Sequence, residues 1–338
     1  VPDKPKTFEQ NWQATSLDDL KNTTVGQAVR DEEYANENNR KEEEQRLAQL
    51  EKERVEIHQK NEALFAQAVE AAKDADAVIF VGGLNHDLDS EGFDRSDMKL
   101  PYEQDILIEK LLQVRKDMIV TFVGGSPVEM PWRDKAQAIL WSYYAGMETG
   151  NAFAGILFGD INPSGKLAET FPAKYEDCAT AKNGQFGKWG EIKLEEGLYY
   201  GYRHFDRAHI APAFCFGHGL SYTTFEYSGL KLQADKNKNV KLTFTVKNTG
   251  KKAGAETVQV YVAPISHKED RPDKELKGFE KVTLAPGKSQ KVSISLHQQD
   301  FAYFDVHVHD FVADTGDYEI LVGASSGDIR LKGIVTLE

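Results

Sequence analysis

The chain has 338 residues, of which 40% are hydrophobic and 28% charged, the composition of an ordinary soluble globular protein with room for two domains and a sizeable core. Its formal net charge of −13 argues against nucleic acid or an anionic membrane as a partner, because both bind basic surfaces. No apolar run approaches the roughly 20 residues that span a bilayer.

Residues 1–74 read as a polar N-terminal segment that contains a long charged helix. From about Val29 to Lys73 there is neither Pro nor Gly, and a partial apolar stripe appears at helical spacing. Its members are Leu47, Leu50, Val55, Leu64, Ala68, Val69 and Ala72. This pattern favours a solvated helix whose C-terminal half packs on a sheet. A coiled-coil contact with another chain is the weaker alternative, because the a/d repeat is not sustained.

Residues 75–225 alternate between strand and helix patterns. Buried strands are predicted at 77–81, 118–123 and 138–143, with helices at 102–115 and 147–158. This order predicts a parallel sheet covered by helices on both faces. Only three or four strands are visible, so we expect something outside this chain to complete one edge of the sheet.

The loop at residues 85–101 is the candidate site. It follows a strand that ends at Gly82-Gly83, and ligands of open α/β sheets bind at the carboxyl ends of the strands. Its carboxylates are those of Asp87, Asp89, Glu91, Asp94 and Asp97, with Arg95 among them. A solvated acidic loop without a function is the alternative; Glu91 is the residue we favour.

Residues 226–338 change to an all-β pattern, after an aromatic, loop-rich stretch at 173–225. Short strands with period-two alternation are predicted at 240–247, 256–262, 281–284, 291–296 and 317–322. Turn signals such as Pro286-Gly287 separate them. The spacing predicts a β-sandwich of about 100 residues.

A set of motifs occurs in a fixed order along the chain. They include SEGFDR (90–95), LPYEQ (100–104), GGSPVEMPW (124–132), EEGLYYGYRHFD (195–206) and FGHGLSYTTFEYSGL (216–230). In this order and spacing, over about residues 75–335, the chain resembles the C-terminal part of family 3 glycoside hydrolases of the β-glucosidase and β-xylosidase type. The resemblance implies an α/β sandwich followed by a fibronectin type III-like domain, as the two patterns above also predict.

The resemblance also implies a retaining exo-β-glycosidase, most simply a β-glucosidase acting on a β-linked glucoside or oligosaccharide. In that family a barrel supplies an aspartate nucleophile and the sandwich contributes the general acid/base, which matches Glu91 here. Retaining hydrolysis needs two carboxyl groups about 5–5.5 Å apart. We expect Asp94 and Arg95 to shape the loop, pairing with each other or with the backbone, and His86 is a candidate for lining the pocket. Glu195 or Glu196 is the less favoured acid.

Nothing before residue 75 resembles the barrel or its nucleophile. A barrel needs about 250 residues, so this chain alone holds an incomplete active site. We expect a barrel domain or chain as partner; a second copy of this chain is another candidate. A β-xylosidase of the same architecture and a non-catalytic carbohydrate-binding or scaffold chain remain alternatives.

Other residue groups carry weaker signals. The histidines show no metal-binding spacing, and the Gly-rich pieces lack the spacing of a nucleotide site, so we expect no metal and no cofactor. Trp132, Tyr143 and Tyr144 are weighed as a sugar-stacking platform, although buried packing is favoured. The two cysteines, Cys178 and Cys215, do not fix the redox compartment. We favour a secreted or periplasmic location over a cytoplasmic one.

Overall fold

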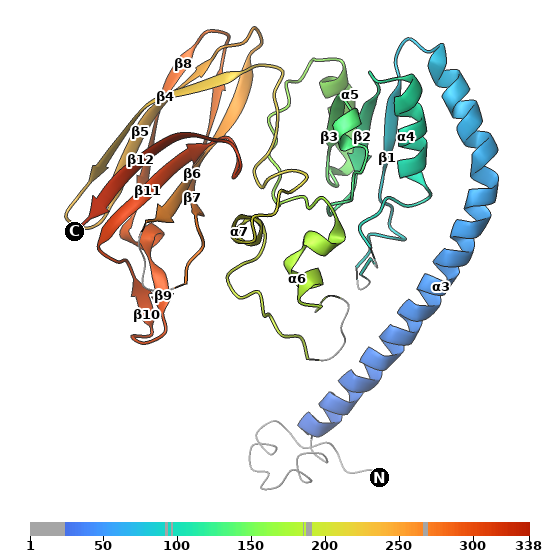
Figure 1. Ribbon diagram of the computed structural model, residues 1–338, viewed down its shortest axis with the longest axis horizontal. Helices are drawn as coiled ribbons and strands as arrows, with labels where there is room; N and C mark the ends of the chain where they lie inside the picture. The colour runs from blue at the N-terminus through green and yellow to red at the C-terminus, as the bar shows by residue number, and fades with distance from the viewer. Residues whose placement is uncertain (1–23, 92–93, 96, 185, 187–190, 266–269) are drawn as a thin grey trace.

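The computed structural model describes residues 24–338 except 92–93, 96, 185, 187–190 and 266–269, and leaves out some side chains of the first helix. The described chain runs from a long helix through a small parallel sheet with its helices to a β-sandwich (Figure 1). This order confirms the predicted fold class. In the part of the chain that the structure describes, no helix combines the length and apolar character needed to cross a membrane.

Helix α3 (Thr24–Lys73) confirms the predicted long charged helix and begins somewhat earlier than expected. Its first turns extend away from the rest of the molecule, Arg46 donates a hydrogen bond to the Asp87 carbonyl of the candidate loop, and its last turns pack beside α4 (Figure 1). Phe65 and Ala72 are buried there, but Leu64 is exposed, and so is Val55, another member of the predicted stripe. The predicted stripe is therefore wrong at Leu64, because the face toward α4 is centred one residue further along the helix.

The parallel sheet contains three strands in the order β1-β2-β3. The strands are β1 (Ile79–Gly83), β2 (Ile119–Val123) and β3 (Ala138–Trp141), and the helices that follow them include α4 (Gln104–Val114) and α5 (Thr149–Leu157). Strand β1 lies two residues later than predicted, because Gly82 and Gly83 still pair with Phe122 and Val123 of β2. The core beneath α4 includes Ile108, Val120, Phe122 and Trp132.

One face of β1 departs from the prediction that both faces are covered. Ile79 and Val81 are 43% and 69% exposed, although Phe80, on the opposite face, packs against the core. Residues of α3 and α4 belong to the same core cluster as Phe80. In the described residues, no strand pairs with the outer edge of β1. The open face and edge agree with a sheet that another part of the protein completes.

The side chain of Gln104 closes the last residue of this open edge. Its Nε2 donates to the Gly83 carbonyl at 2.9 Å, and its Oε1 accepts from the Gly83 N–H at 2.8 Å. These are the two backbone groups that a neighbouring strand would otherwise bind. The first residue of α4 thus ends the ladder where β1 gives way to the candidate loop.

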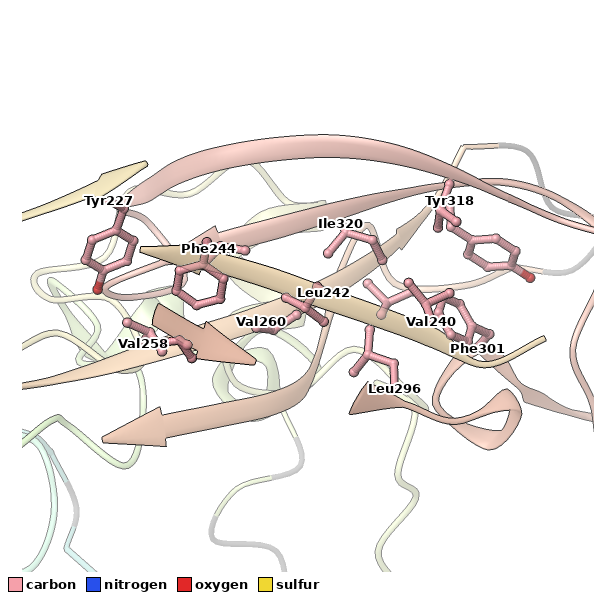
Figure 2. Packing of buried hydrophobic residues seen from close by; sticks show 14 of the residues in the cluster. Tyr227, Val240, Leu242, Phe244, Val258, Val260, Leu296, Phe301, Tyr318 and Ile320 are labelled. Carbon is pink, nitrogen blue, oxygen red and sulfur yellow. The ribbon is translucent and has the colours of Figure 1, made fainter. Parts of the chain in front are cut away.

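The β-sandwich packs a four-stranded sheet, in the order β12-β11-β6-β7, against a three-stranded sheet in the order β4-β5-β8. Side chains from both sheets, including Phe244, Val260, Leu296 and Ile320, fill the space between them (Figure 2). The strands are β4 (Phe225–Ala234), β5 (Val240–Asn248), β6 (Gly254–Pro264), β7 (Glu275–Leu284), β8 (Ser289–Leu296), β11 (Gly316–Gly323) and β12 (Ile329–Leu337). A separate hairpin consists of β9 (Tyr303–Asp305) and β10 (Asp310–Val312).

The five predicted strands of this domain are present, but β4, β9, β10 and β12 were not predicted. Strand β7 also begins at Glu275 rather than at 281. The remaining helical pieces are short: α6 (Ala179–Lys182), α7 (Tyr202–Arg207), η1 (Arg133–Lys135), η2 (Gly146–Glu148), η3 (Tyr175–Asp177) and η4 (Gln298–Phe301).

A buried polar seam joins the sandwich to the preceding domain. The Lys166 Nζ lies 3.3 Å from Glu256 Oε1 on β6, and the Tyr227 hydroxyl donates to the same oxygen at 2.9 Å. Gln259, also on β6, donates to the carbonyls of Gly217 and Ala324. Buried ions of this kind are tolerated only when they are paired, so the seam fixes how the two domains meet.

A second, more exposed junction lies at α7. The Tyr199 hydroxyl donates to Asp270 Oδ1 at 2.6 Å, and Arg207 Nη1 donates to both of these oxygens at 2.6 Å. Lys274 pairs with Asp206 at 2.5 Å. The EEGLYYGYRHFD segment is therefore held by the sandwich as well as by its own domain.

Candidate active site

The candidate loop leaves the sheet at the carboxyl end of β1. Leu84 N donates to the Val123 carbonyl at 2.9 Å, which extends the pairing with β2 by one residue. A tight turn follows, in which Leu88 N and Asp89 N both donate to the Asn85 carbonyl. Nearby, the segments after β2 and β3 begin at Gly124 and Ser142, so three loops meet at this edge, as the sequence predicts for a site.

Glu91 lies on the surface of this loop, two residues after Asp89, and is exposed. Its neighbours Gly92 and Phe93 of the SEGFDR motif lie outside the described residues. A carboxyl group keeps its proton near neutral pH when burial or a nearby negative charge disfavours the ionised form. An exposed Glu91 would gain such an environment when another surface covers the loop.

Asp89 anchors the first half of the loop to the rest of the domain. Its Oδ2 accepts hydrogen bonds from Gly125 N at 2.8 Å and from the Tyr144 hydroxyl at 2.8 Å. Burial, together with the bond to Asp89, raises the pKa of Tyr144 to about 12, so Tyr144 stays a donor at neutral pH. The contact joins the loop after β1 to those after β2 and β3.

Arg95 anchors the second half of the loop. One terminal nitrogen, Nη2, donates to Ser126 Oγ at 3.1 Å and to the Pro127 carbonyl at 2.7 Å. The other, Nη1, is buried and has no hydrogen-bond partner within the described residues. Burial lowers the pKa of Arg95, and the carboxylates of Asp89 and Asp97 oppose that shift. Of the two arrangements that the sequence left open for Arg95, the geometry is that of backbone pairing, and Asp94 is exposed.

His86 and the aromatic residues occupy different environments. The His86 side chain is 92% exposed, with its Nε2 3.3 Å from Asp87 Oδ1. Trp132 is fully buried, and its Nε1 donates to Asp105 at 2.6 Å, so it cannot stack on a sugar. Tyr144 is about half exposed beside the loop. Of the three aromatic residues weighed as a platform, Trp132 belongs to the core.

In the EEGLYYGYRHFD segment, the carboxylate that binds Tyr199 comes from the following domain. Tyr199 is held by Asp270 of the following domain and by Arg207. In the same stretch, Glu196 buries one carboxylate oxygen without a hydrogen-bond partner among the described residues, and Glu195 is exposed. Within the described parts of the chain, no group of three or more His, Cys, Asp or Glu side chains has the geometry to hold a metal ion.

Sequence reasoning missed the pairing of Asp89 with Tyr144 and the closure of the β1 edge by Gln104. A signal for the first exists in Gly125, because a Cβ there would lie 2.9 Å from both Asp89 Oδ2 and Tyr144 Cε2. A glycine at that point of GGSPVEMPW indicates that another segment approaches its backbone closely. The sequence does not say which segment.

Comparison with known proteins agrees with this architecture. Residues 5–222 match the glycosyl hydrolase family 3 C-terminal domain, and residues 256–326 match the fibronectin type III-like domain. The first match starts at residue 5, so the likeness begins well before residue 75, where we expected it to begin. The family model thus takes in α3.

The relatives named here are longer than this chain. Thermostable β-glucosidase B of Acetivibrio thermocellus is 44% identical over 275 residues, which are 80% of this chain and 36% of that protein. A β-glucosidase of Rhizobium radiobacter is 40% identical over 277 residues, or 34% of its length. The chain thus spans about a third of the length of these relatives.

Solved structures give the same picture. The β-glucosidase of Kluyveromyces marxianus in complex with glucose superposes with a TM-score of 0.78 at 37% identity, covering 81% of this chain and 33% of that one. A family 3 β-glucosidase of Bifidobacterium adolescentis superposes with a TM-score of 0.77 at 39% identity, covering 81% and 41%. This chain therefore belongs to glycosyl hydrolase family 3, of which it carries the C-terminal domain followed by a fibronectin type III-like domain.

Proposed function

We propose that this chain is the acid/base-bearing part of a retaining exo-β-glycosidase that removes terminal β-D-glucosyl residues, with Glu91 as the general acid/base. The observation that supports this best is the place of Glu91. It lies on a loop at the carboxyl edge of the sheet, and that loop is anchored on both sides by Asp89 and Arg95. The names of the relatives, β-glucosidases, support glucose as the sugar.

The chemistry needs a second carboxylate that comes from outside the chain. In retaining hydrolysis one carboxylate attacks the anomeric carbon while the other protonates the leaving oxygen, and the second step reverses the role of the acid. A barrel in the rest of the protein, or in a partner chain, would supply the aspartate nucleophile. The same surface would cover Glu91 and disfavour its charged form. Asp94 and His86, exposed near Glu91, are proposed to contact that surface or the substrate.

The test uses the intact protein that carries this chain. Glu91→Ala is expected to lower kcat/KM for an alkyl β-glucoside, a poor leaving group, by about 10²–10⁴-fold. For dinitrophenyl β-glucoside, which leaves without protonation, the loss is expected to be small in the glycosylation step. Added azide should restore turnover and give a β-glucosyl azide of retained configuration. Asp87→Ala, which removes an exposed carboxylate of the same loop, is the matched control.

Four outcomes separate the alternatives. Normal turnover of the alkyl glucoside by Glu91→Ala would assign the acid elsewhere, with Glu195 and Glu196 the next variants. A higher kcat/KM for aryl β-xyloside than for aryl β-glucoside would make the protein a β-xylosidase of the same architecture. Glycan binding without turnover in the intact protein would support a carbohydrate-binding or scaffold chain. Hydrolysis by the isolated chain would refute the requirement for a barrel.

A further inference from the structure

We propose that Asp89 is the positioning residue of the acid loop, acting with Tyr144 and Arg95 to hold Glu91 at a fixed point above the sheet edge. The inference rests on the proposed role of Glu91. It adds a role for a carboxylate that neither attacks nor protonates the substrate. The contacts that carry it join two points of the loop to a single short turn.

That turn, residues 125–127 after β2, is called the anchor turn here. It binds the loop on both sides of Glu91. Asp89, two residues before Glu91, accepts from Gly125 N at 2.8 Å, and Arg95, four residues after it, donates to the Pro127 carbonyl at 2.7 Å. The Asp89 contact restricts the backbone two residues ahead of Glu91 before substrate binds. The acid would therefore be positioned in advance rather than on binding.

The Asp89 contact is specific in its geometry. One carboxylate oxygen accepts two hydrogen bonds, from the anchor turn and from Tyr144, so three loops converge on one atom. A Cβ at residue 125 would lie 2.9 Å from that same oxygen. A side chain at this position would therefore displace Asp89 or Tyr144 from the present contact.

The arrangement is coupled to Arg95 through charge. Burial of Arg95 disfavours its charged form, and the negative charge of Asp89 is among those that favour it. Loss of Asp89 would remove two hydrogen bonds before Glu91, those from Gly125 and Tyr144. It would also remove a negative charge that stabilises the Arg95 guanidinium after Glu91. Both effects loosen the segment that carries Glu91, although neither touches the substrate.

A purely structural role and a positioning role predict different kinetics. A loosened Glu91 impairs protonation of the leaving group, so the loss should depend on how much protonation the leaving group needs. For Asp89→Ala in the intact protein, we expect kcat/KM to fall on the order of 10²-fold for an alkyl β-glucoside, the size of effect known for small misplacements. For dinitrophenyl β-glucoside we expect kcat/KM to fall by less than about threefold, because its leaving group needs no protonation.

Matched variants sharpen the test. Asp89→Asn keeps an oxygen that can accept both hydrogen bonds, so it should retain most activity on the alkyl glucoside. Tyr144→Phe removes one of the two donors and should give a smaller loss with the same dependence on the leaving group. Gly125→Ala should reproduce the Asp89→Ala pattern, whereas Gly150→Ala, where a Cβ meets nothing within 4 Å, should not. Asp87→Ala serves as the charge control.

A double variant decides whether Asp89 acts through Glu91. If it does, Asp89→Ala in the Glu91→Ala background should lower the rate on the alkyl glucoside no further. Losses that multiply, or an equal loss on both substrates, would overturn the positioning role. If Glu91→Ala alone shows no dependence on the leaving group, the proposed function fails instead. Should Asp89→Ala not fold, Tyr144→Phe and Asp89→Asn decide in its place by the same comparison.

Discussion

Gln104 provides the sharpest test of how the sheet edge is stabilised. Its amide makes two hydrogen bonds to the backbone of Gly83, at 2.8 and 2.9 Å. Replacement by Leu keeps the approximate volume of the side chain but removes both bonds. Each is worth about 1 kcal/mol net, so Gln104→Leu should lower the free energy of unfolding by about 2 kcal/mol.

The assay can be confined to the right domain. Trp132 and Trp141 lie in the core around the parallel sheet, and residues 226–338 contain no tryptophan. Urea unfolding followed by tryptophan fluorescence therefore reports on the part of the chain before the sandwich, with Trp12 and Trp189 as the other two tryptophans. With a slope of about 2 kcal/mol per molar urea, the midpoint should fall by about 1 M.

The control is Gln113→Leu, an exposed position on the same helix, which should leave the midpoint unchanged. Gln104→Glu should give an intermediate loss, because a carboxylate still accepts from Gly83 N–H but repels the carbonyl. A Gln104→Leu midpoint equal to that of the unmodified chain would refute the reasoning. So would an equal fall in the Gln113→Leu control.

Two further predictions concern charge and protonation. Glu256→Gln removes the carboxylate that pairs with the buried Lys166 ammonium, so the free energy of unfolding should fall by about 3–5 kcal/mol. The fall is measured as a lower midpoint of thermal unfolding, followed by near-UV circular dichroism. Lys166→Met combined with Glu256→Gln should recover most of it, and a double variant as unstable as the single one would contradict the buried-pair explanation. Burial, aided by Asp89 and Asp270, raises the pKa values of Tyr144 and Tyr199 to about 12, above the ordinary value of 10.0. The folded protein thus holds these protons where the unfolded chain releases them, so their contribution to stability is complete below about pH 10 and is lost as pH rises toward 12. The variant with both Tyr144→Phe and Tyr199→Phe should lose stability less steeply over that range in thermal unfolding; an unchanged slope would contradict the assignment.

Strand and helix types could be predicted wherever burial imposes a period. Strand β5 alternates cleanly, with Leu242, Phe244 and Val246 turned into the core, and its prediction is correct. The first half of β7 could not be found in this way. Glu275 and Leu276 contact Arg203 and Tyr202 of α7. The residue types there are therefore set by contacts with a neighbouring segment and not by burial in the sandwich core.

The candidate site shows the same division. That the loop after β1 lies at the carboxyl edge of the sheet follows from a strand ending in two glycines. The partner of Tyr144 is Asp89 and not a neighbouring carboxylate because of how two segments 55 residues apart in the chain pack against each other. Such a pairing has no periodic signal. The role of Glu91 itself stays a prediction.

The two junctions with the sandwich bear on how the protein can be shortened or recombined. Cutting the chain before β4 would remove the carboxylate of Glu256 from Lys166 and that of Asp270 from Tyr199, so the α/β domain would keep a lysine without its carboxylate and a loosened aromatic segment. A chimaera with a sandwich from another protein would need carboxylates at the positions of Glu256 and Asp270. The two domains are therefore best exchanged between homologues as a single unit together with α3, whose last turns pack into the same core as α4.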